Sequence, residues 1–258
     1  MLAKIIKWLG FRAYLQKLKH LMIKSQISTM SPIERHIYLN TVFDDTNIFH
    51  PQYLEWTMKR INKILELYGL DFFKNRKILE LGGGIGDIGG FFAELGAEVL
   101  SLEGRLMNVV LAQLKNSRIK NYKCRQFNLE NDFSEFGKFD LIINFGLVYH
   151  LKNVEKHLNC CAKMADNILL ETVVCDSTDS SKIILVDDPE GNDEALDGTG
   201  SRPGPYYIER IFENNNFEVT RCFSKDLNSE PFVYDWEHKN DNSLLANRRR
   251  FWKFGKNR

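Results

Sequence analysis

The stretch from Ile78 to Gly90 constrains the fold more than any other part of this chain. Its sequence, ILELGGGIGDIGG, places a short apolar run directly before a cluster of glycines and the start of a helix-like segment. Glycine lets the backbone take positive φ angles and approach a ligand closely, and the first turn of a helix carries N–H groups without helical acceptors. This order of strand, glycine loop and helix predicts an α/β fold that holds a nucleotide-like cofactor at the loop.

Two families share such a loop. Gly84, Gly86 and Gly89 fit G-x-G-x-x-G, the dinucleotide pattern that places a pyrophosphate at a helix N-terminus. Gly82, Gly84 and Gly86, preceded by Glu80, equally fit E/D-x-G-x-G-x-G, and in this the segment resembles the class I S-adenosylmethionine-dependent methyltransferases. The acid before the first glycine favours the methyltransferase interpretation.

A carboxylate ends the next apolar run, residues 97–103, which reads AEVLSLE. Glu103 lies about 20 residues after the glycine loop, where a carboxylate accepts hydrogen bonds from ribose hydroxyls. NAD and S-adenosylmethionine share that ribose, so Glu103 indicates an adenosine site without choosing between the two cofactors.

The segment 139–151, FDLIINFGLVYHL, resembles the fourth strand and the following turn of the same methyltransferase family. Its dense apolar run fits a strand that is covered on both faces. In open α/β sheets ligands bind beyond the carboxyl ends of the strands, so this turn is expected beside the glycine loop. The second match favours methyl transfer over a nicotinamide-dependent oxidoreductase.

The C-terminal part completes the resemblance, which covers about residues 77–256. We expect a strand at 167–174, a helix at 205–214 and two closing strands at 217–223 and 250–254. The resemblance therefore implies a three-layer, Rossmann-like α/β fold. Its seven-stranded sheet is mostly parallel, ends in an antiparallel strand pair and is preceded by N-terminal helices.

We expect two parts in the chain, a helical N-terminal extension or cap over residues 1–70 and a methyltransferase domain over 71–258. Residues 1–24 are basic, contain no acid and carry apolar side chains at helical spacing. This predicts a helix that packs on the domain or on a partner, with peripheral membrane contact as the alternative. A second helix is expected at 52–68. Its Tyr53 and Trp56 are candidate substrate contacts, because such helices often cover the substrate cleft in related enzymes; core packing is the alternative.

Charge and cysteine content indicate the cellular compartment of the protein and the partners it can have. The chain has 258 residues, a formal net charge of +1 and 5 cysteines without metal-binding spacing. No apolar run approaches the roughly 18 residues of a membrane span. These features predict a cytoplasmic protein with reduced cysteines, and the near-neutral charge disfavours a nucleic-acid partner.

The resemblance implies a set of cofactor contacts. In relatives a polar side chain and a backbone N–H after the third strand contact adenine, and here those positions are Asn128 and Leu129. Asp87 follows the last tight glycine, where it either approaches the methionine end of the cofactor or stabilises the helix N-terminus. The expected cofactor-binding residues are Glu80, Gly82, Gly84, Gly86, Asp87, Glu103, Asn128, Leu129 and Asn144.

His150 is the strongest candidate for a catalytic base, with Tyr149 as a weaker one. Methyl transfer from a sulfonium needs a base only when the acceptor must lose a proton. A neutral imidazole can accept that proton near pH 7. The alternatives for His150 are a contact to cofactor or substrate and a structural role.

An insertion at about 176–202 carries several acids, at positions 187, 188, 190, 193 and 194. We expect a solvated acidic loop, long enough to act as a lid, and no metal site. The insertion ends at Arg202, just before the helix expected near Pro205. A guanidinium beside a helix N-terminus suits an anionic acceptor, whereas helix capping by Ser201 or Pro203 is the alternative.

The sequence thus predicts an S-adenosylmethionine-dependent methyltransferase acting on an oxygen or nitrogen atom of a small molecule, such as a sugar, a lipid or a secondary metabolite. The nearest alternative is an RNA-modifying methyltransferase, because residues 146–151, GLVYHL, also resemble a class of enzymes that modify the wobble uridine of tRNA. An NAD(P)-dependent oxidoreductase and a non-catalytic cofactor-binding module are further alternatives.

Overall fold

The computed structural model describes residues 51–188, 195–229, 232–234, 236 and 248–257, together with residues 25 and 29–31. The chain divides into two compact units, residues 1–47 and 48–258. The basic helix expected at 1–24 and the acids at 190, 193 and 194 lie outside the described residues. Within the described part, no helix is both long and apolar enough to cross a membrane.

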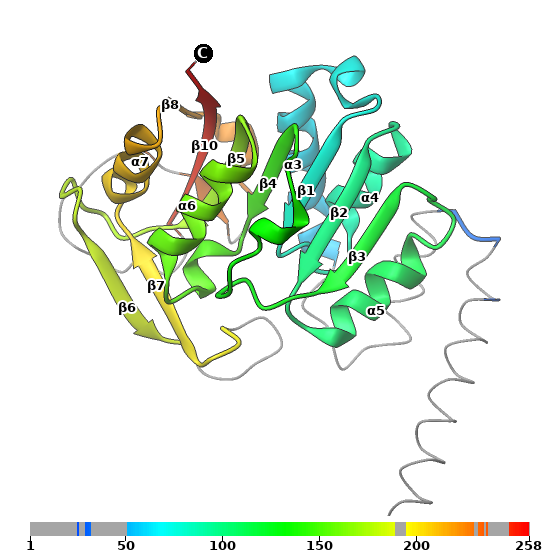
Figure 1. Ribbon diagram of the computed structural model, residues 1–258, viewed down its shortest axis with the longest axis horizontal. Coiled ribbons are helices and arrows are strands. Elements are labelled where there is room, and N and C mark those ends of the chain that lie inside the picture. The colour runs from blue at the N-terminus through cyan, green and yellow to red at the C-terminus, as the bar shows by residue number, and fades with distance from the viewer. Residues whose placement is uncertain are drawn as a thin grey trace, which may run out of the picture. The chain divides into compact units, whose positions relative to one another are not determined.

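The second unit is built on an eight-stranded sheet with the order β3-β2-β1-β4-β5-β10-β8, and β9 pairs with β10 (Figure 1). Seven strands therefore form the path that the sequence predicts. The bounds are β1 Lys77–Leu81, β2 Glu98–Glu103, β3 Tyr122–Gln126, β4 Leu141–Phe145, β5 Asn167–Val173, β8 Phe217–Arg221, β9 Val233–Tyr234 and β10 Arg248–Lys256.

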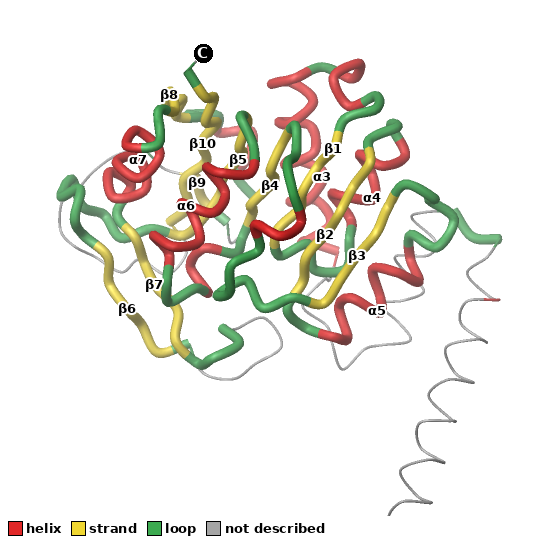
Figure 2. Tube along the Cα trace, viewed as in Figure 1, coloured by secondary structure: helices red, strands yellow, loops and turns green. Residues whose placement is uncertain are grey.

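Helices cover both faces of this sheet (Figure 2). The helices are α3 Pro51–Tyr68, α4 Asp87–Glu94, α5 Leu106–Lys115, α6 Val154–Met164 and α7 Pro205–Asn214, with short 3-10 turns η2 Leu70–Phe73, η3 Ser134–Phe136, η4 Val148–His150 and η5 Lys225–Leu227. Successive strand residues point to opposite faces. Accordingly Ile78 packs in one core with α3, α4 and α5, and Leu79 packs in the other with α6 and α7.

The parallel strands bring the predicted motifs to one edge. β1 pairs in parallel with both β2 and β4, so the glycine loop, Glu103 and the turn after Phe145 all follow carboxyl ends of neighbouring strands. The chain runs from β1 to β3 on one side and then crosses to β4 on the other. This reversal is the place where open α/β sheets bind ligands.

The C-terminal half confirms the antiparallel ending. β10 runs antiparallel to β5 and β8, and α7 has the bounds that the sequence predicts. The Rossmann-like α/β prediction is therefore confirmed. The division into a cap of residues 1–70 and a methyltransferase domain stays a prediction; in the structure α3 belongs to the same compact unit as the sheet.

The insertion differs from the solvated loop that we expected. It forms a separate antiparallel hairpin of β6 Ile183–Asp187 and β7 Thr199–Pro203 (Figure 1). The sequence of β7, TGSRP, combines glycine and proline, which have low strand propensity. The local sequence therefore gives no strand signal. Pairing with β6 is what holds β7 extended.

Candidate functional site

The glycine loop takes the backbone form of the methyltransferase motif. The φ angles of Gly82, Gly84 and Gly86 are 69°, 53° and 75°. Residues other than glycine rarely adopt this region of backbone conformation. Gly89 is helical, and a Cβ on it would collide with the carboxyl group of Glu80. The glycines of the E-x-G-x-G-x-G pattern are therefore the ones that shape the loop, and Gly89 instead lets the helix α4 pack closely on Glu80.

Glu80 supports the loop from beneath. Its side chain is 3% exposed, and its Oε1 accepts a hydrogen bond of 2.9 Å from the backbone N–H of Gly89. A Cβ on Gly83 would collide with Ser101 Oγ and the Glu80 carboxyl group, so the loop lies directly on these side chains. Burial raises the pKa of Glu80 to about 7, and the bond from Gly89 opposes this rise.

Replacing Glu80 by glutamine is expected to remove a pH dependence of stability. The ordinary pKa of this carboxyl group is 4.5, so the unfolded chain loses the proton before the folded chain does. The resulting loss of stability begins near pH 4.5 and is complete near pH 7, with a total on the order of 3 kcal/mol. Urea unfolding measures this effect at two pH values. Between pH 5.5 and pH 8, the free energy of unfolding of the wild type should fall by about 2 kcal/mol more than that of the Glu80→Gln variant.

The exposed Glu98 on β2 provides the matched control, because its carboxyl group is hydrated in both states. The Glu98→Gln variant should follow the pH profile of the wild type. Parallel profiles for Glu80→Gln and the wild type would show that Glu80 titrates as an ordinary carboxyl group.

Glu103 lies at the end of β2, where the sequence predicts the ribose contact. Its carboxylate accepts hydrogen bonds from the backbone N–H groups of Gly84, at 3.0 Å, and Arg105, at 2.9 Å. Asn108 Nδ2 adds a third bond of 3.3 Å. These donors fix an anionic group beside the glycine loop, and its contact with a ribose stays a prediction.

A buried histidine, His157, links two of the expected cofactor-binding residues, Asn144 and Leu129. The amide of Asn144 donates to Nε2 of His157 at 2.9 Å, so Nδ1 of the same ring donates to the carbonyl oxygen of Leu129 at 3.2 Å. Burial lowers the pKa of His157 to about 4, which keeps the ring neutral. Asn144 thus contacts α6 in this structure, while Asn128 accepts a bond from the N–H of Glu130. The cofactor roles of Asn128, Leu129 and Asn144 remain predictions.

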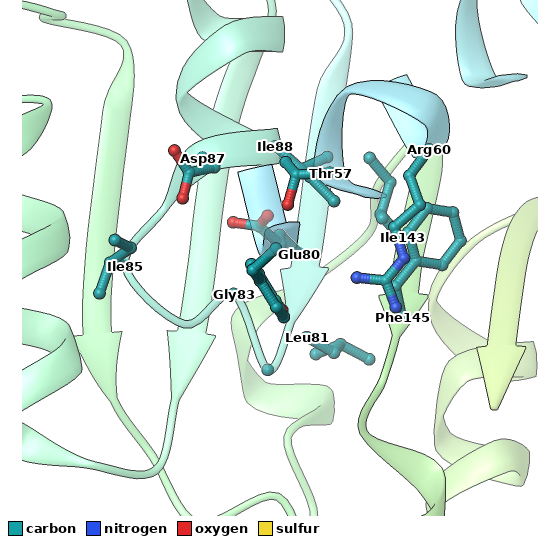
Figure 3. A pocket seen from close by; sticks show the side chains of 12 residues that line it. Thr57, Arg60, Glu80, Leu81, Gly83, Ile85, Asp87, Ile88, Ile143 and Phe145 are labelled. Atoms are coloured by element: carbon teal, nitrogen blue, oxygen red, sulfur yellow. The ribbon is translucent and has the colours of Figure 1, made fainter. Parts of the chain in front are cut away.

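A pocket joins the glycine loop to α3 (Figure 3). Arg60 and Phe145 lie at one end of it and Asp87 and Ile85 at the other, with Gly83 between them. Asp87 forms an ion pair with the buried Lys115, so its charge is already balanced. The lining residues are Tyr53, Thr57, Arg60, Glu80, Leu81, Gly82, Gly83, Ile85, Asp87, Ile88, Ile143 and Phe145.

A buried group that we call the arginine cluster, Arg60, Glu171 and Arg249, borders this pocket. The three side chains are 2%, 0% and 4% exposed. Glu171 pairs with Arg60 and, at 2.7 Å, with Arg249. The Nε atoms of both arginines have no hydrogen-bond partner in the described part of the chain. Sequence reasoning missed this cluster, although Arg249 lies in a visible run of three arginines.

The two aromatic candidates of α3 lie beside the arginine cluster. The guanidinium group of Arg60 lies 3.2 Å from the centroid of the Trp56 ring, and Trp56 Nε1 donates to the hydroxyl of Tyr234 at 2.8 Å. Tyr53 lines the pocket itself. Tyr53 is therefore in a position to meet a bound molecule, whereas Trp56 is 2% exposed and supports Arg60.

The catalytic candidates follow β4 in the turn η4. Tyr149 accepts a hydrogen bond of 3.2 Å from Arg249, and His150 Nδ1 lies 2.9 Å from Asp188 Oδ2. Arg202 donates to the carbonyl oxygen of Tyr149 at 3.2 Å. The structure therefore brings His150, Tyr149 and Arg202 together, and their catalytic and substrate roles stay predictions. The described residues contain no group of three or more metal-ligating side chains.

Comparisons with known proteins agree with this architecture. A family model described as a methyltransferase domain matches residues 53–221. Among solved structures, the N-terminal domain of EvdMO1 with S-adenosylhomocysteine bound superposes with a TM-score of 0.59 at 22% identity, covering 78% of this chain and 81% of that one. Magnesium protoporphyrin IX methyltransferase from Synechocystis PCC 6803 with bound S-adenosylmethionine gives 0.55 at 12% identity, covering 92% and 97%.

A curated sequence adds a partial match. The ubiquinone biosynthesis O-methyltransferase of Bartonella tribocorum is 34% identical over 95 residues, which are 36% of this chain and 38% of that protein. The matched segment thus spans well under half of either protein.

Proposed function

The chain belongs to the methyltransferase domain family, and we propose that it transfers a methyl group from S-adenosylmethionine to an oxygen or nitrogen atom of a small molecule. A sugar, a lipid and a secondary metabolite are the classes we consider. The family match argues against the nicotinamide-dependent alternative. The S-adenosylhomocysteine and S-adenosylmethionine bound in the two solved structures of similar fold support S-adenosylmethionine as the cofactor.

The pocket between the glycine loop and α3 is the observation that carries this proposal. It is lined on one side by the loop residues Gly82 and Gly83 and on the other by Tyr53 and Arg60 of α3. A group that reaches the cofactor through this pocket must fit beneath a helix. Such a site suits a compact acceptor better than an extended polymer.

The protein residues have a limited task in this reaction. The cofactor supplies an already activated methyl group, and alignment of the acceptor alone contributes roughly 7 to 11 kcal/mol to lowering the barrier. Tyr53 and Phe145 supply walls that exclude water, and His150 is the group that accepts a proton when the acceptor is a hydroxyl. The curated relative is named an O-methyltransferase, which supports an oxygen acceptor.

The charge of the arginine cluster supports an anionic bound group. Two guanidinium groups against one carboxylate leave one positive charge buried, and an unpaired buried charge is unfavourable. A carboxylate or phosphate of a bound molecule would balance it. The methionine carboxylate of the cofactor and an acidic group on the acceptor are both candidates. In either case Arg60 is a stronger candidate than Arg202 for the contact with the anionic group.

Isotope labelling tests the proposal directly. Cell extract is incubated with the enzyme and S-adenosylmethionine that carries a labelled methyl group, and the small-molecule, RNA and protein fractions are then analysed by mass spectrometry. We expect labelled products in the small-molecule fraction. Label that enters RNA alone would support the RNA-modifying alternative, and no label in any fraction would contradict the proposal.

A further inference from the structure

The hairpin β6–β7 contacts the turn that carries the catalytic candidate. Asp188, the residue after β6, is 8% exposed, and its Oδ2 lies 2.9 Å from His150 Nδ1. The backbone N–H of Ala195 donates to the same oxygen at 2.9 Å. The backbone of Ala195 therefore holds the Asp188 carboxylate in place while the same carboxylate faces the imidazole ring of His150.

We propose that Asp188 is a positioning residue that holds His150 in the tautomer with the proton on Nδ1, so that Nε2 is the base for methyl transfer. This inference rests on the proposed function, because it supplies the base for a hydroxyl acceptor. Asp188 itself contacts neither acceptor nor cofactor in this scheme.

The chemistry follows from the two ring nitrogens. A carboxylate only accepts hydrogen bonds, so the neutral ring must donate from Nδ1, which leaves a lone pair on Nε2. Among the residues that the structure describes, none bonds to that nitrogen. In the reaction, the acceptor O–H proton moves to Nε2 as the new C–O bond forms. The C–S bond breaks with its electron pair going to sulfur, and Asp188 then faces an imidazolium ion.

The turn η4 lies against the cofactor loop. A Cβ on Gly82 would stand 3.1 Å from the Cβ of Leu147, the residue just before η4. The turn also packs on β7, because a Cβ on Gly200 would lie 2.5 Å from the Tyr149 carbonyl oxygen and 2.9 Å from Asp188 Oδ2. The hairpin, the histidine turn and the first cofactor glycine thus form one continuous contact.

The other polar groups around His150 leave Asp188 as the acceptor for Nδ1. The centroid of the Tyr149 ring lies 4.0 Å from that of the imidazole. Arg202 of β7 donates hydrogen bonds to the carbonyl oxygens of Tyr149 and Ser201. Asp187 is exposed and lies next to Asp188 in the chain. It therefore provides a matched control of the same charge on the same hairpin.

Nitrogen-15 NMR of the full chain with labelled histidine tests the inference. The resonances of His150 are assigned by their loss in the His150→Gln variant, and the spectra are recorded at a pH where the ring is neutral. We expect the Nδ1–H tautomer in the wild type and in Asp187→Asn, and a shift toward the Nε2–H tautomer in Asp188→Asn. A wild-type ring with its proton on Nε2 would overturn the inference without any variant.

The labelling assay supplies the second readout. Asp188→Asn should lower the rate of methyl transfer at least roughly tenfold and leave the affinity for S-adenosylhomocysteine unchanged, since the cofactor loop is intact. A changed tautomer with an unchanged rate would overturn the inference while the proposed function stands. A wild-type enzyme that labels no small molecule would instead overturn the proposed function.

Discussion

Replacing Glu171 by leucine is expected to lower the free energy of unfolding by about 3 to 5 kcal/mol, because it leaves two buried guanidinium groups without a counter-charge. Burial alone would raise the pKa of Glu171, yet Arg249 and Arg60 hold it below its ordinary value. The carboxylate is therefore charged in the folded protein at neutral pH. Urea unfolding at pH 7 measures the loss, which should lower Tm on the order of 10 °C.

Two controls separate this effect from the loss of any glutamate. Glu218 lies exposed on β8, so Glu218→Leu should change the free energy of unfolding by less than about 0.5 kcal/mol. The triple variant Arg60→Met, Glu171→Leu, Arg249→Met removes all three charges and should recover most of the stability. A Glu171→Leu variant as stable as the wild type would mean that solvent reaches both arginines.

The glycine loop could be predicted because its signal is local. A positive φ at Gly82, Gly84 and Gly86 needs glycine at those positions, and the acid Glu80 supports the loop from within the same strand. The alternation of strands and helices from β1 to β5, and the closing elements α7, β8 and β10, likewise follow from short apolar runs between turns. The fold and the methyltransferase family were therefore accessible from the sequence.

The arginine cluster could not be predicted in the same way. Arg60 and Glu171 are 111 positions apart, and Glu171 and Arg249 are 78 apart. No spacing rule joins residues of α3, β5 and β10, and only the order of strands in the sheet brings them together. An apolar run such as that of β5 also gives no sign that its single carboxylate is paired.

The contact of His150 with Asp188 was missed for a related reason. Both residues were noted separately, one as a base and the other as part of an acidic insertion. The hairpin pairing of β6 with β7 turns the insertion back onto η4, and that pairing depends on backbone contacts instead of on a local propensity. The acidic character of the insertion therefore did not reveal the role of one of its members.

Replacing Glu103 by alanine is expected to weaken the binding of S-adenosylhomocysteine by roughly 100-fold. Its carboxylate lies 3.0 Å from the N–H of Gly84 and ends the strand next to β1, which places an anionic acceptor at the cofactor edge of the sheet. Charge-assisted hydrogen bonds to two ribose hydroxyls contribute about 1.5 to 3 kcal/mol each. The lower limit for the pair, about 3 kcal/mol, corresponds to a loss in Kd of roughly 100-fold. The Glu103→Gln variant keeps an oxygen for Gly84 and should lose less.

Isothermal titration of the full chain with S-adenosylhomocysteine tests the central claim most directly, with Glu98→Ala as the control from the exposed start of the same strand. We predict one binding site in the wild type, an unchanged affinity in Glu98→Ala and the 100-fold loss in Glu103→Ala, whose fold is checked by circular dichroism. A wild-type chain that binds no S-adenosylhomocysteine, or a folded Glu103→Ala variant with unchanged affinity, would contradict the cofactor site described above.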